Sequence, residues 1–182
     1  MSQNDSPIDP LARFGVVPLF RLTSTDIQHG QPLKPAQYGT SAGGQGVSPQ
    51  LEWSGFPSST RSFAVTAYDP DAPTGSGFWH WALYNLPADV TSLPAGAGAL
   101  SGRLLPEAAR MLPNETRQPE YAGVTPPEGT GTHRYQFIVH AVDVPSLGID
   151  PESTPAVLGF NLHFHVLGRA VIEATGVFGG AG

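Results

Sequence analysis

The sequence predicts a single domain that is mostly β-structure. Three short segments rich in β-branched and aromatic residues, each followed closely by a proline, read as strands at 62–69, 78–86 and 134–144. Gly (22) and Pro (19) together exceed a fifth of the 182 residues, which indicates many turns and few long helices. A chain of this length typically forms one domain, expected here at 14–182 after a flexible polar arm at 1–13.

Composition and charge exclude several classes of protein. The formal net charge is −6 and the nine cationic residues are dispersed, so no basic footprint for nucleic acid or an anionic membrane is present. The absence of cysteine excludes disulfides, a thiol nucleophile and Cys-ligated metal. We find no secretory signal and no apolar run near the ~20 residues of a transmembrane helix, and therefore expect a cytoplasmic protein.

The first half of the chain reads as strands joined by glycine- and proline-rich loops. An apolar segment at 16–22 and the alternating Leu51–Trp53 are short strand candidates, separated by a flexible loop at 39–46. The segment 62–69 is almost wholly apolar, so it should be a central strand covered on both faces. The loop PDAPTGSG then leads to the strand 78–86.

The second half is predicted to be irregular, then a strand, then a helix. Residues 87–132 show one short helical turn, at 107–111, before the strand 134–144. Pro155 suits a first helical turn and Gly176 suits the position after a helix end, so the expected helix spans about 155–175. One apolar face would hold Phe160, Phe164, Leu167 and Val171. Arg169 would share a solvent-facing row with His165 and Glu173.

Polar side chains stand at the ends of the three clearest strands. Asp69 closes the first strand, and His133 and Tyr135 share a face where the third begins. Near the start of the second strand, alternation groups His80 with Ala82 and Tyr84. If these strands are neighbours, Asp69, His80 and His133 converge at one sheet edge. Taken singly, Asp69 is equally typical of a turn before proline, and each histidine of a structural role.

Two long motifs carry a family resemblance. The segment 68–81 (YDPDAPTGSGFWHW) closely resembles the first signature of the phosphatidylethanolamine-binding protein family, and 131–135 (GTHRY) resembles the second. Shorter matches are Pro126-Pro127, 48–53 and 159–162. The resemblance covers roughly 16–178 and is strongest to the bacterial branch, the Raf-kinase-inhibitor-like proteins.

The resemblance implies an antiparallel β-sandwich with a few peripheral helices and a surface pocket for phosphate, a phosphoethanolamine headgroup or a similar anion. By motif position the ligand-binding residues would be Asp69, His80, His133, Tyr135, Ala122, Gly123, Pro126 and Pro127. It also implies a cis peptide before Pro73. The negative charge of Asp69 would repel an anionic ligand. We therefore expect Asp69 to pair with a histidine and to favour the protonated, hydrogen-bond-donating form of that imidazole. The prediction includes no cofactor, no metal and no catalytic residue.

The sequence departs from the family pattern in two places. The loop 121–127 carries Ala122 and Thr125 where relatives are more glycine-rich and often contain cysteine, which leaves ligand size open. The stretch 96–118 has no family signature.

Other functions are weighed against anion binding. Gly39–Gly43 fits the G-x-S-x-G elbow of serine hydrolases, but glycines follow where that elbow needs a helix. Asp69, His80 and His133 match the ligand set of some iron sites, at undistinctive spacing. A His–Asp pair supports weak acid/base hydrolysis, although no nucleophile is evident. Relatives also inhibit kinases or proteases by docking, and bacterial relatives often form homodimers.

Overall fold

The computed structural model describes residue 11 and residues 15–182, so the predicted arm at 1–13 lies outside the described residues except for Leu11. Within these residues, eight strands form two antiparallel sheets. The larger has the order β6 (Arg110–Met111), β4 (Phe78–Pro87), β3 (Ser62–Asp69), β7 (His133–Val142) and β8 (Val166–Gly176). The smaller has the order β1 (Arg21–Thr23), β2 (Leu51–Ser54) and β5 (Ser92–Leu93). The helices are η2 (Pro35–Gln37), η3 (Thr40–Ala42) and α1 (Pro155–His165).

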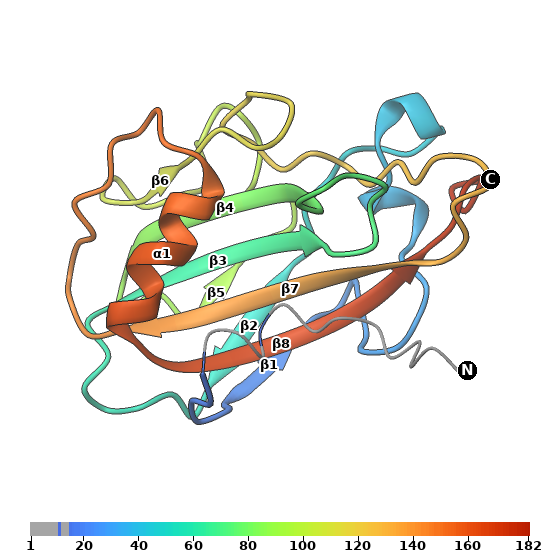
Figure 1. The fold of residues 1–182 in the computed structure, drawn as a ribbon. Helices are drawn as coiled ribbons and strands as arrows, with labels where there is room; N and C mark the ends of the chain where they lie inside the picture. Colours follow the sequence, from blue (N-terminus) through green and yellow to red (C-terminus); the bar gives the residue numbers. More distant parts are fainter. Residues whose placement is uncertain (1–10, 12–14) are drawn as a thin grey trace, which may run out of the picture.

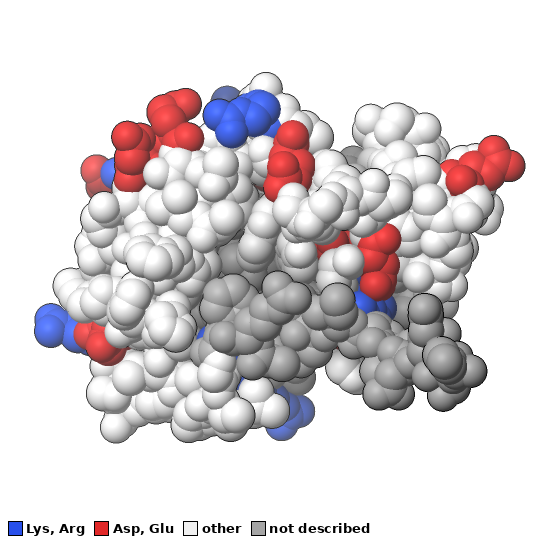
Figure 2. All heavy atoms as spheres, viewed as in Figure 1, with Lys and Arg blue, Asp and Glu red and all other residues white. Residues whose placement is uncertain are grey.

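The two sheets and α1 form three layers (Figure 1). The main core lies between the sheets, where the Trp53 ring on β2 meets Phe63 on β3 edge-on at 5.4 Å between centroids. On the other face of the large sheet, Leu158 and Leu162 of α1 join a second buried cluster with Ala82 of β4. Lys, Arg, Asp and Glu side chains lie mostly at the margins of that face (Figure 2). The predicted class, a β-sandwich with a peripheral helix near the C-terminus, is confirmed.

Strand β3 is the centre of the large sheet. Its side chains are buried on both faces, as its unbroken apolar run predicts, and it pairs with β4 on one edge and β7 on the other. Asp69 is its last residue, and Pro70 follows where the pairing ends. The strand therefore delivers a carboxylate to the end of an otherwise apolar layer.

The predicted C-terminal helix is wrong in its second half. Helix α1 begins at Pro155, as expected, but ends at His165, and β8 continues directly to Gly176. Ala170, Ile172 and Ala174 are buried at every second position, which is the period of a strand. Pairing along the whole free edge of β7 overrides the helical pattern, because those ladder hydrogen bonds form only in the tertiary structure.

The surface assignments made for that helix change accordingly. Phe160 and Phe164 are 66% and 63% exposed rather than packed on the core. Arg169 lies in β8 and is buried instead of solvent-facing, and its Nη1 donates to the Gly15 carbonyl.

Two smaller expectations also change. The turn predicted at 107–111 ends in the short strand β6, because Arg110 and Met111 pair with the edge of β4. The first apolar segment, 16–22, forms a strand only at its end, as β1. None of the helices in the described part of the chain has the length and hydrophobicity needed to cross a bilayer.

Candidate functional site

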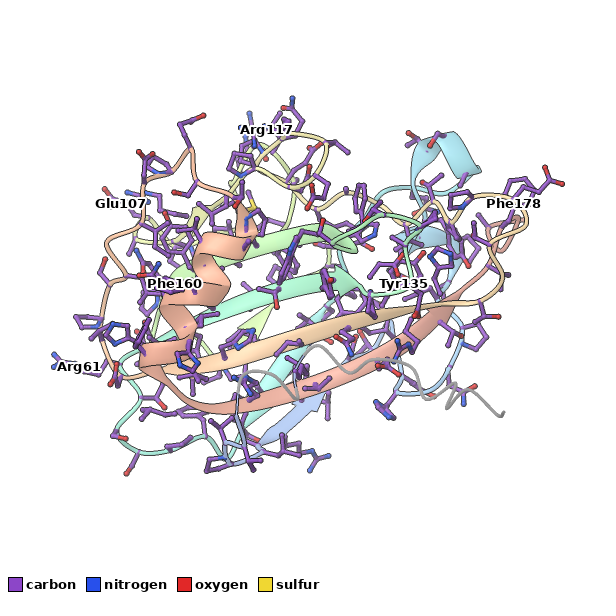
Figure 3. All side chains as sticks on the ribbon, in the orientation of Figure 1. Arg61, Glu107, Arg117, Tyr135, Phe160 and Phe178 are labelled. Atoms are coloured by element: carbon purple, nitrogen blue, oxygen red, sulfur yellow. The ribbon has the colours of Figure 1, made fainter. Side chains whose placement is uncertain are left out.

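The three predicted strand ends meet at one end of the large sheet. Asp69 ends β3, His133 begins β7 and His80 lies near the start of β4. Antiparallel pairing brings these positions together, because β3 runs toward the end from which both neighbours start (Figure 1). Tyr135, labelled in Figure 3, lies at the same end, away from α1.

A β-bulge turns His80 toward Asp69. Ala67 pairs with Trp81 but Tyr68 pairs with Trp79, so β4 has one extra residue, His80, opposite β3. Ala82 joins the cluster under α1, as does Tyr84, whereas His80 faces the opposite side. The predicted grouping of His80 with Ala82 and Tyr84 is therefore wrong, although the expected convergence with Asp69 occurs. Such a bulge re-aims a side chain that simple alternation would place on the other face.

Asp69 is a buried carboxylate with several donors. Its Oδ2 lies 2.7 Å from Nδ1 of His133, and its Oδ1 accepts the backbone N–H of Asp71 at 2.8 Å. Burial, and next the charge of this carboxylate, raises the pKa of Tyr135, whose side chain lines the same pocket. Asp69 thus fixes the orientation of the His133 ring and stays compensated in the interior.

Both ring nitrogens of His133 are engaged. The Thr130 hydroxyl donates to the Pro127 carbonyl at 2.7 Å, because a carbonyl oxygen can only accept. Its oxygen then accepts from Nε2 of His133 at 2.8 Å, while Nδ1 donates to Asp69. Two donating nitrogens are the hydrogen-bonding pattern of an imidazolium, which balances the buried carboxylate. His133 consequently has no N–H left for another molecule.

His80 is held differently. Its Nδ1 lies 2.8 Å from the Ala122 carbonyl, and the Ala122 N–H donates back to the His80 carbonyl at 2.8 Å. Burial lowers the pKa of His80 to about 4, against the smaller raising effects of the Ala122 carbonyl and Asp69, and His133 lowers it further. The neutral ring donates from Nδ1, so Nε2 is left as an acceptor toward the pocket.

These groups line a pocket of about 430 Å³. All eight predicted binding residues are among its walls: Asp69, His80, Ala122, Gly123, Pro126, Pro127, His133 and Tyr135. The Phe78 ring lies 4.7 Å from the His80 ring and the Tyr135 ring 5.4 Å from it, measured between centroids. The pocket therefore combines an apolar lining with a few convergent polar groups, as small-molecule sites do.

Close backbone contact fixes the outer wall. Gly39 donates to the Val124 carbonyl at 2.9 Å, which joins the loop after η2 to the predicted wall loop. A Cβ on Gly123 would lie 2.6 Å from the Gly39 Cα, so only glycine fits there. The wall loop is therefore held against the loop after η2 by a backbone hydrogen bond and by close backbone packing.

The comparison with protein-family models decides the family. The model described as phosphatidylethanolamine-binding protein matches residues 23–178 of this chain. The chain belongs to the phosphatidylethanolamine-binding protein family. Among its relatives is the UPF0098 protein YbhB of Escherichia coli, 43% identical over 157 residues that cover 85% of this chain and 98% of YbhB. E. coli YbcL is 42% identical over 84% of this chain and 85% of its own length.

A solved structure agrees with the family fold. The crystal structure of E. coli YbcL, described as a new member of the mammalian PEBP family, superposes with a TM-score of 0.82. The match covers 86% of this chain and 96% of that chain at 40% identity. The family resemblance expected from the two motifs is confirmed.

One feature expected of the family is not met. No cis peptide occurs among the described residues, so the bond before Pro73 is trans. The Thr74 N–H donates to the Ala72 carbonyl at 2.7 Å, closing a three-residue turn around Pro73 that a trans proline can adopt. The loop is also anchored by Asp71, whose carboxylate accepts hydrogen bonds from Nε and Nη2 of Arg134, each at 2.8 Å. That guanidinium lowers the pKa of Asp71.

Sequence reasoning missed several hydroxyl side chains of the site. Ser41, from the loop read only as flexible, and Thr116, from the stretch without a family signature, both line the pocket. Thr130 anchors His133 from the TPPEGTGT loop. Only the position of Thr130 next to the GTHRY motif offered a signal, since the other two arrive through long-range loop packing.

Two alternatives, the metal site and the serine-hydrolase elbow, gain no support from this geometry. Within the described residues, no three His, Asp or Glu side chains lie close enough together to hold a metal ion. Ser41 lies in η3, which neither follows a strand nor continues as a longer helix, so the hydrolase elbow is not formed.

Proposed function

We propose that this family member binds a small phosphate monoester headgroup, such as phosphoethanolamine, with a phosphate oxygen at Nε2 of His80. The observation that carries the proposal is the fixed orientation of His80. Its Nδ1 is tied to the Ala122 carbonyl, so the other nitrogen serves the pocket that Asp69 and His133 also line.

The charges of the pocket favour a ligand that brings a proton. Asp69 is matched by His133, and His80 is neutral near pH 7 because its pKa is about 4. A fully ionised phosphate would meet a lone pair at Nε2 and a buried carboxylate nearby. A phosphate that shares one proton with Nε2 instead gains a short, charge-assisted hydrogen bond.

Calorimetric titration with O-phosphoethanolamine tests the proposal. We expect the wild-type protein to bind it and His80→Phe, which keeps ring volume but removes the nitrogen, to lose detectable binding. His163→Ala, on α1, is the matched histidine control and should bind normally. Unchanged binding in His80→Phe would refute the assignment.

The same variant separates ligand binding from the alternative of kinase or protease inhibition. A protein that inhibits through its outer surface should keep its activity after His80→Phe, because that side chain is buried. Mass spectrometry of small molecules that co-purify with the wild-type protein, but not with this variant, would identify the physiological headgroup.

A further inference from the structure

A second cavity of about 290 Å³ lies on the opposite face of the large sheet, partly beneath α1. Its walls include Tyr68, Trp79, Gln136, Ile138, His140 and Leu162. Strand alternation keeps it apart from the first pocket, because Gln136 and His140 point away from the face of His133 and Tyr135.

One residue that lines the cavity, Gln136, has a buried acceptor with no partner. The Gln136 side chain is buried, and its Nε2 donates to Glu173 at 3.0 Å. Its Oε1 is buried without any hydrogen bond. Flipping the amide would set that oxygen against the Glu173 carboxylate, so the orientation is fixed. Leaving such an acceptor unmet in the interior is costly, and a donor from a bound molecule would satisfy it.

His140 offers a second unmet polar atom at the other end. Its Nε2 lies 3.2 Å from the Thr66 hydroxyl, while Nδ1 is buried without a partner. Because the hydroxyl can donate or accept, Nδ1 is able to take either role. Burial, and secondarily the charge of Arg169, lowers the pKa of His140 to about 3, so the ring is neutral. Four residues separate Gln136 from His140 along β7, roughly 13 Å, with Ile138 as the apolar floor between them.

Gly159 provides independent support for a site kept open. It lies inside α1, where glycine is unfavourable relative to alanine, and it lines the cavity. Its φ is not positive, and a Cβ built there meets no atom within 4 Å. Neither backbone conformation nor packing requires glycine at this position, whereas a larger side chain would enter the cavity.

We propose that this cavity is a second ligand site, for a small, elongated, uncharged molecule with an apolar body and an N–H or O–H donor at the Gln136 end. The apolar walls of Trp79, Ile138 and Leu162 suit an aromatic or aliphatic body. The neutral His140 ring, with Arg169 nearby, disfavours a cation. The volume is near the lower end of ligand sites, so the molecule is smaller than a nucleotide or lipid.

Backbone NMR titration with 4-propylphenol, which carries a single hydroxyl at one end of an apolar body, tests this site. We expect shifts at Trp79, Gln136 and His140, and binding at least tenfold weaker for the methyl ether that lacks the phenolic donor. Gln136→Met should bind the phenol and the ether equally. Gly159→Leu should abolish binding, whereas Gly159→Ala, the matched control, should retain it.

Three outcomes would overturn the proposal: equal binding of phenol and ether by the wild type, undiminished binding in Gly159→Leu, or shifts confined to other regions. The two Gly159 variants should fold as well as the wild type, since alanine and leucine both favour helix over glycine. A dispersed spectrum and an unchanged melting temperature check this directly.

Discussion

Binding of phosphoethanolamine should take up one proton near neutral pH, and the proton should depend on His80. The pKa of His80 in the free protein is about 4, so the ring arrives neutral at any pH above that value. The second proton of a phosphate monoester is lost near pH ~6. The proposed complex holds one proton between Nε2 and the phosphate oxygen, whichever partner supplies it.

The magnitude follows from these two values. Between about pH 4 and 6 the ligand already carries the proton, so affinity should be flat. Above about pH 6 affinity should fall by up to tenfold per unit, about 1.4 kcal/mol, because the proton must come from water. The sulfate ester of ethanolamine has no proton to bring. Its affinity should therefore fall from about pH 4 upward, as His80 alone must be protonated.

Calorimetry in two buffers of different ionisation enthalpy measures the proton directly. About 1.5 pH units above the phosphate pKa we expect an uptake approaching one proton. About 1.5 pH units below the same pKa we expect an uptake near zero. His80→Gln keeps an amide donor at the same place and should bind more weakly without proton uptake. PH-independent affinity of the wild type through the phosphate titration, with no proton uptake, would refute the reasoning.

Further predictions concern stability, measured by denaturant unfolding. Asp69→Asn should cost about 1–3 kcal/mol, because both carboxylate oxygens accept hydrogen bonds in the interior and the amide NH2 would face one of those donors; full stability would show that these two hydrogen bonds are dispensable. Gly123→Ala should cost about 1–3 kcal/mol through its clash with Gly39, and full stability would mean that the wall loop yields. As pH falls through the ordinary histidine range, His80 and His140 become protonated in the unfolded chain but stay neutral in the folded protein, because their folded-state pKa values are lowered to about 4 and about 3. The free energy of unfolding should therefore decrease on acidification. His140→Phe should flatten that decline by up to about 1.4 kcal/mol per pH unit, and an unaltered slope would contradict the depressed pKa of His140.

Much of the site followed from local sequence. The strands 62–69, 78–86 and 134–144 were predicted within two residues of β3, β4 and β7, because their apolar runs end at residues that cannot continue a ladder. The family motifs then placed polar side chains at the ends of those strands. All eight predicted pocket residues lie in one cavity, while their role in binding stays a prediction.

Only the tertiary structure decided the remaining features. Segment 166–176 suits both a helix and a strand, and the free edge of β7 selected the strand. The bulge at His80 depends on the register between β3 and β4, which alternation within one strand cannot reveal. The sequence therefore determined which residues end the strands, whereas the structure determined which way they face. The physical reason is that strand ends are set by local backbone chemistry, but register and edge pairing are set by contacts between distant segments.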